Sequence, residues 1–244
     1  MLKLDQNLKY RQLPKHLQEH LTFVPTDVTK QVIAVFTFIL LDLVIAMPLL
    51  FPFVKTVLFV TIPVITVINI WAILLLLKDS TQTKFESLLY LGFLGAVGSF
   101  SYFVLILKMN FYALNVQSPI LISISIIVYL VYVILLIYLR EKNTSLSRNI
   151  LKSKFNNLNI IKWAAPTGYI LTQIMVNQTP QIMNSYMVVM YSFIMFFFTN
   201  MGIKFLHRYL FMRNNPHLVT FSTFESGRKG TKVRFGKVNR DVKN

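Results

Sequence analysis

The sequence predicts an all-α integral membrane protein, built as a bundle of six transmembrane helices. Of the 244 residues, 55% are hydrophobic and only 14% are charged, whereas an ordinary soluble domain carries about 25% charged residues. The mean hydropathy of the chain is +0.56. The apolar residues come in blocks close to the roughly 20 residues that a helix needs to cross a bilayer.

Two features that the sequence lacks limit the class of protein further. The chain contains no cysteine, which excludes disulfides and cysteine-ligated zinc or iron–sulfur centres. Residues 1–20 contain no apolar h-region and no small-residue cleavage site, so no signal peptide is expected.

Four apolar segments are clear candidates for membrane spans: residues 31–52, 57–77, 86–107 and 119–139. Thr83 and Glu86 match the T-x-x-E capping box just before the third segment. An N-cap residue followed by proline at the first helical position opens the fourth segment and a later one, at Ser118-Pro119 and Thr179-Pro180.

Two further spans complete the count. The fifth, residues 160–177, is weaker because it contains Lys162, Pro166, Gly168 and Gln173. The sixth runs from Pro180 to about residue 203, and its helical spacing continues until Pro216 stops it. The chain thus divides into a basic N-terminal segment, a six-helix membrane domain and a basic tail, at residues 1–30, 31–203 and 204–244.

The distribution of basic residues tests this count. With six spans, 23 of the 25 Lys and Arg residues fall on one side of the membrane, and only Lys55 and Lys108 fall on the other. With five spans, the ten basic residues of the tail would face outward. The positive-inside rule therefore favours six spans and places both termini in the cytoplasm.

The basic tail contributes much of the formal net charge of +16. Attraction to anionic inner-leaflet lipids is worth about 1 kcal/mol per basic residue near the surface, and we expect it at Arg208, Arg213, Arg228, Lys229, Lys232 and Arg234. Nucleic-acid binding is the less favoured alternative, because the same charges are needed for orientation. Around the turn-like "ESGRKG", residues 218–224 and 231–235 predict a small β-hairpin.

Asp42 is the only acidic residue deep within a predicted span. No Lys or Arg lies at its depth, so its partner should be neutral. The candidates are Asn69, Ser99, Ser101, Ser125 and Gln173. We favour a structural role, as a protonated carboxyl hydrogen-bonded between helices, over a proton or cation site in a small transporter or channel.

Three glycines in the third segment, Gly92, Gly95 and Gly98, form a small face. Small residues let helix backbones approach closely in lipid. We expect this face to pack inside one chain, and homodimerisation is the alternative.

The motif search finds one match, His16-x-x-Glu19-His20, which fits the H-x-x-E-H pattern of inverzincin-type zinc proteases. Zinc catalysis needs a third protein ligand, and the candidates are Glu86, His207 and His217. An amphipathic helix that leads into the membrane, with an apolar face at Leu13, Leu17 and Leu21, explains the stretch without zinc. We therefore predict no enzyme, no metal and no cofactor, with a zinc hydrolase as the alternative.

In overall character the chain resembles the small multi-pass proteins of low-GC Gram-positive bacteria. Lys-, Asn-, Ile- and Phe-rich usage, the lack of cysteine, about six spans and a basic tail carry this resemblance. Some proteins of this kind are encoded beside type VII secretion systems in staphylococci, including immunity proteins. The resemblance implies a non-enzymatic accessory, regulatory or immunity protein with a protein partner in or at the membrane.

Overall fold

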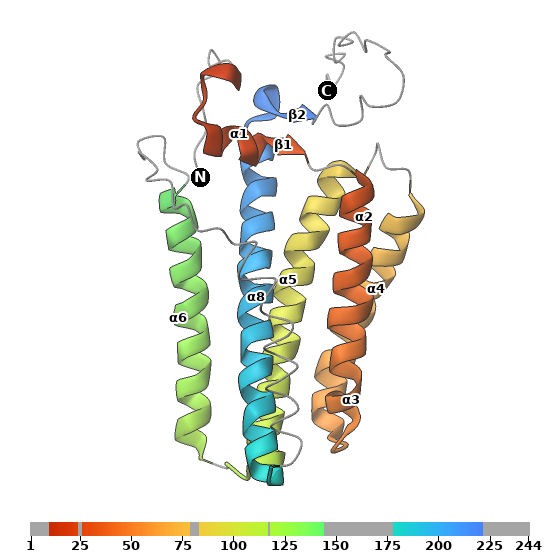
Figure 1. The fold of residues 1–244 in the computed structure, drawn as a ribbon, viewed down its shortest axis with the longest axis vertical. Helices are drawn as coiled ribbons and strands as arrows, with labels where there is room; N and C mark the ends of the chain where they lie inside the picture. The colour runs from red at the N-terminus through yellow and green to blue at the C-terminus, as the bar shows by residue number, and fades with distance from the viewer. Residues whose placement is uncertain (1–9, 24–25, 79–82, 117, 144–177, 222–244) are drawn as a thin grey trace, which may run out of the picture.

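The computed structural model describes residues 10–23, 26–78, 83–116, 118–143 and 178–221. These residues form an upright helical bundle with a small cap at one end (Figure 1). Five of the described helices are long and apolar enough to cross a membrane, and the described chain is mostly helical, as predicted. The predicted fifth span, 160–177, lies outside the described residues, so the count of six spans stays a prediction.

The first span is a composite helix. It consists of α2 (Thr26–Ala34), a π-helical segment η2 (Val35–Leu43) and α3 (Val44–Leu50). The backbone N–H of Val44 donates to the carbonyl of Ile39, which is the five-residue spacing of a π-helix. Pro48 follows within α3 and has no backbone N–H to donate. The helix therefore begins before the predicted 31–52 segment and carries a wide turn that periodicity did not reveal.

The other long helices match their predicted segments within a few residues at most ends. They are α4 (Lys55–Leu77), α5 (Lys84–Lys108), which continues as η3 (Met109–Ala113), α6 (Pro119–Asn143) and α8 (Pro180–Asn214). As predicted, α8 continues past residue 203 until Pro216, which begins the 3-10 turn η4 (Pro216–Leu218). The capping box was wrong in one detail. Helix α5 begins directly after Thr83, but the Thr83 side chain makes no capping hydrogen bond.

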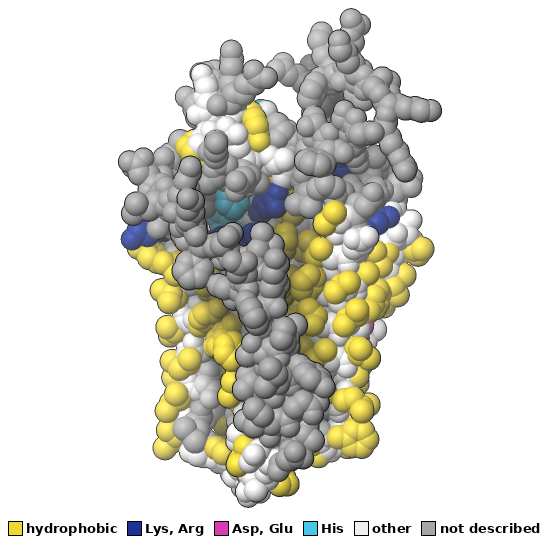
Figure 2. All heavy atoms as spheres, in the orientation of Figure 1, with side chains coloured by type: hydrophobic (Ala, Val, Ile, Leu, Met, Phe, Trp, Pro, Cys, Tyr) yellow, Lys and Arg dark blue, Asp and Glu magenta, His cyan; other side chains and the backbone are white. Residues whose placement is uncertain are grey.

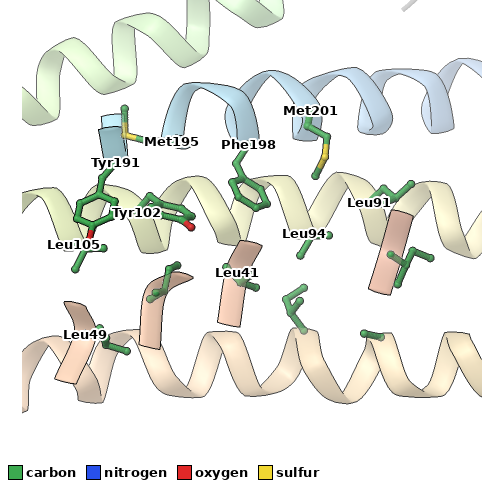
Figure 3. Close-up of a cluster of buried hydrophobic side chains, with 14 of the residues drawn as sticks. Leu41, Leu49, Leu91, Leu94, Tyr102, Leu105, Tyr191, Met195, Phe198 and Met201 are labelled. Carbon is green, nitrogen blue, oxygen red and sulfur yellow. The ribbon is translucent and has the colours of Figure 1, made fainter. Parts of the chain in front are cut away.

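Helix α5 is the centre of the bundle. Within its apolar stretch 61% of the residues are buried, against none in α6. Its side chains interlock with those of α8 and of the first span, where Leu41, Leu94, Tyr102 and Phe198 are fully buried (Figure 3). The outer faces of the long helices are apolar (Figure 2), which is compatible with insertion in a bilayer.

The cap joins the two ends of the described chain. It contains η1 (Tyr10–Gln12), α1 (Lys15–Leu21) and β1 (Thr22–Phe23), together with η4 and β2 (Thr220–Phe221). Strand β1 pairs with β2 in parallel, with Thr22 opposite Thr220. The predicted apolar face of α1 is buried in a second hydrophobic cluster, formed by Leu13, Leu17, Leu21, Leu88, Phe211, Met212 and Leu218.

The predicted hairpin overlaps the cap only in part. Its first run, 218–224, includes β2, which pairs with the N-terminal segment. Its second run, 231–235, lies outside the described residues, so the hairpin stays a prediction.

Candidate functional site

Asp42 and Asn69 meet inside the bundle. Asp42 lies in η2 and Asn69 near the middle of α4, and the Asn69 amide nitrogen donates to a carboxylate oxygen of Asp42 over 3.0 Å. Both side chains are partly buried. Within the described ranges Asp42 forms no ion pair, so a neutral side chain serves as its partner.

Of the other candidates for the partner of Asp42, Ser125 lies on α6, and the hydroxyl of Ser101 hydrogen-bonds to none of the described residues. The hydroxyl of Ser99 hydrogen-bonds to Tyr129 over 2.9 Å and to Thr199 over 2.5 Å. Ser101 on α5 is fully buried. Gln173 lies outside the described residues.

The chemistry open to this pair is limited. The side-chain oxygen of Asn69 is buried and accepts no hydrogen bond from the described residues. One carboxylate and one amide oxygen supply three oxygen ligands at most, whereas Mg²⁺ and Ca²⁺ take six or more. The arrangement fits a hydrogen bond between two helices, or a single bound proton, better than a bound metal cation.

The three glycines of α5 face α8. A Cβ atom built on Gly95 would overlap the backbone of Gly202, and one on Gly98 would overlap the ring of Phe198. A Cβ on Gly92 would lie 2.7 Å from the Cδ2 atom of Leu206. The small face is therefore occupied by a helix of the same chain. A homodimer would need another surface.

Two basic side chains at the cap end donate hydrogen bonds to backbone carbonyls of other elements. The guanidinium of Arg208 on α8 donates to the backbone carbonyls of His20 and Thr22, which ties the cap to the bundle. Lys30 donates to the carbonyls of Leu76 and Lys78, over 3.0 and 2.8 Å, at the end of α4. Of the residues expected to face anionic lipid, Arg213 is exposed. Arg228, Lys229, Lys232 and Arg234 lie outside the described residues.

The zinc motif lies on α1. The ring of His20 packs 6.2 Å from that of His207, measured between centroids, and His207 is one of the three residues considered as a third ligand. Glu86 is engaged elsewhere, in an ion pair with Lys78 at 3.1 Å and a hydrogen bond from Trp71. The side chains of His16 and Glu19 lie outside the described part of the structure. Among the described residues no group of three metal-ligating side chains gathers.

Several contacts had no signal in the sequence. Arg208 and Thr22 are 186 residues apart, and neither belongs to a motif. Lys108 is buried at the end of the bundle opposite the cap and donates to the carbonyls of Pro48 and Leu49, each over 2.7 Å. Such contacts depend on how the helices are rotated and shifted against one another, which apolar run lengths do not encode.

The chain matches no protein-family model, no curated protein and no solved structure.

Proposed function

We propose that the protein is a non-enzymatic, six-span protein of the bacterial plasma membrane that acts as an accessory, regulatory or immunity partner of another membrane or secretion component. The observation that carries this proposal is the packing of α6. Its apolar stretch is long enough to cross a membrane, yet none of the residues in it is buried.

Helix α6 touches the bundle along one edge. Its contacts with α8 and α5 include the ring of Tyr132 against Phe196 and that of Tyr129 against Phe103, both with centroids 4.7 Å apart. The rest of its surface is aliphatic and exposed, as at Leu130 and Ile134. Because packing drives helix association in lipid, a helix with so few contacts to the described residues has a surface that a helix of a partner would cover.

Site-specific photo-crosslinking in native membranes tests this proposal. A photoreactive residue at Leu130 or Ile134 on α6 should give a protein adduct of discrete size. The matched positions are Ile62 and Val67 on α4, which are also aliphatic and exposed, and they should give only lipid adducts. Lipid adducts alone from α6, or the same protein adducts from both helices, would overturn the proposal.

The arrangement of the described helices supports the six-span count. Contacts of Tyr132 with Phe196 and of Arg140 with Asn200 rise together in residue number, so α6 and α8 run in the same direction (Figure 1). Asn143 and Gln178 therefore lie at opposite ends of the bundle. The proposed fifth span, 160–177, would join these two ends and account for the sixth crossing.

A small transporter or channel that uses Asp42 is the second candidate. The hydrogen bond between Asp42 and Asn69 on a π-helical segment favours it, since π-helical turns often occur at functional sites. Replacement of Asp42 by Asn removes the ionisable group and keeps a hydrogen-bonding side chain. A transporter requires proton or cation flux in proteoliposomes that falls to background in Asp42→Asn. Unchanged growth, expression and flux would exclude this candidate.

A further inference from the structure

A pocket of about 330 Å³ opens between the first span, α6 and α8, close to the cap end. Its volume lies at the lower end of the range for ligand sites, roughly 300–1,000 Å³. It does not include Asp42 or Asn69.

The pocket has an apolar side and a basic side. The rings of Phe36 and Phe197 stack with centroids 5.5 Å apart and form the apolar side together with Val32. Arg140 from α6 and Lys204 from α8 form the basic side. None of the described residues that line the pocket is acidic. This combination is typical of a site for an anionic amphiphile.

Basic side chains cluster around Lys204. Lys204 lies within electrostatic range of both Arg140 and Arg208. Arg140 donates to the side-chain oxygen of Asn200 over 3.3 Å, which holds its guanidinium at the pocket. Like charges at close range repel each other in a medium of low dielectric constant, and a bound anion would relieve this repulsion.

The position of the pocket relative to the apolar segments indicates which kind of anion it would bind. Arg140 directly follows the apolar segment 119–139, and Lys204 directly follows the segment 180–203. Both charges therefore lie where the hydrocarbon region ends and lipid phosphates begin. The stacked rings lie on the hydrocarbon side of them, next to the first methylenes of an acyl chain.

We propose that this pocket binds one anionic phospholipid, with its phosphate between Arg140 and Lys204 and its proximal acyl chain against Phe36 and Phe197. Basic pockets between membrane helices on the cytoplasmic side are known to hold such headgroups, and the planar fork of arginine matches phosphate oxygens. The site is distinct from the diffuse attraction of the basic tail, because it has a defined shape and binds one lipid.

Native mass spectrometry of the full-length protein in neutral detergent tests the proposal, with phosphatidylglycerol as the probe. Wild-type protein should retain one phosphatidylglycerol and no phosphatidylcholine. Arg140→Gln with Lys204→Gln should weaken binding at least about tenfold, since each basic residue contributes about 1 kcal/mol. The matched control is Lys142→Gln with Arg213→Gln, which changes the same charge at exposed positions on the same two helices and should bind as the wild type does.

Four results would overturn the proposal. Equal weakening in both double variants would show diffuse attraction, and equal retention of phosphatidylcholine would remove the role of charge. Displacement of the lipid by low-millimolar inorganic phosphate would make free phosphate the ligand. If the Arg140 and Lys204 variant does not fold, Val32→Trp blocks the pocket without a change of charge, and retained binding in that variant would also refute the site.

Discussion

At the scale of single residues, Lys108 joins two helices at the end of the bundle opposite the cap. Its side chain is 2% exposed, and its ammonium donates to the carbonyls of Pro48 and Leu49. Helix α3 ends at Leu50, so these carbonyls belong to the last turn, where no intrahelical partner is available. Lys108 therefore supplies the hydrogen bonds that the end of α3 lacks, and it fixes α5 against the first span.

Replacement of Lys108 by Met keeps an unbranched apolar stem and removes both hydrogen bonds. We expect the free energy of unfolding to fall by about 1–3 kcal/mol, because the carbonyls of Pro48 and Leu49 lose their donor. Thermal unfolding in detergent, followed by circular dichroism, measures the change. Lys55→Met is the control, since Lys55 lies at the same end and is exposed; it should shift stability by less than about 0.5 kcal/mol. Equal effects of the two substitutions would contradict this role of Lys108.

For a single side chain, the sequence predicted the chemical class of its partner but not which residue the partner is. The absence of basic residues at the depth of Asp42 predicted a neutral partner, and Asn69 was one of five candidates. Which of the five meets Asp42 depends on the rotation of α4 against the π-helical segment, and the sequence carries no signal for that rotation. For the same reason the contact of Arg208 with the cap was not predicted.

At the scale of elements, the lengths of the apolar segments predicted the long helices but not the polar turns that extend them. Helix α2 begins at Thr26, before residue 31, because the polar turn "TDVTK" is helical without being apolar. Helix α5 and its π-helical continuation extend beyond residue 107 to Ala113. A count of apolar residues finds the part of a helix that lies in hydrocarbon, whereas hydrogen bonding and packing determine where the helix ends.

The interface between α5 and α8 gives a prediction at this scale. Gly95 lies against the backbone of Gly202, and a backbone atom cannot move aside as the end of a flexible side chain can. Gly95→Leu should therefore force the two helices apart and lower stability by about 1–3 kcal/mol or more, as overpacking does. Thermal unfolding and the amount of folded protein in membranes measure the effect.

Ala96→Leu is the matched control, because Ala96 is the next residue on α5 and is exposed. It should leave stability close to that of the wild type. The same pair tests the homodimer alternative. A dimer built on the glycine face would dissociate in Gly95→Leu while the monomer kept its melting temperature, and that result would contradict the packing of α5 against α8.

At the scale of the whole molecule, the described basic residues gather at one end of the bundle. Among the described residues, the basic side chains at the cap end include Lys30, Lys78, Arg140, Lys204 and Arg208, and the opposite end has Lys55 and Lys108. Basic side chains are visible near the cap, and the surface below them is apolar (Figure 2). The charge count predicted this asymmetry from the sequence, because it needs only the order of the spans and not their packing.

The orientation can be tested by thiol labelling, since the chain has no cysteine of its own. Four exposed residues serve as single-cysteine sites, namely Lys55, Lys142, Gln178 and Arg213. With six spans and cytoplasmic termini, a membrane-impermeant maleimide should modify Lys55→Cys and Gln178→Cys in intact cells. It should modify Lys142→Cys and Arg213→Cys only after permeabilisation. The decisive pair is Lys142 and Gln178, which flank the connection between α6 and α8. Because these helices run in the same direction, the two sites should lie on opposite sides of the membrane, and labelling of both from one side would refute the six-span topology.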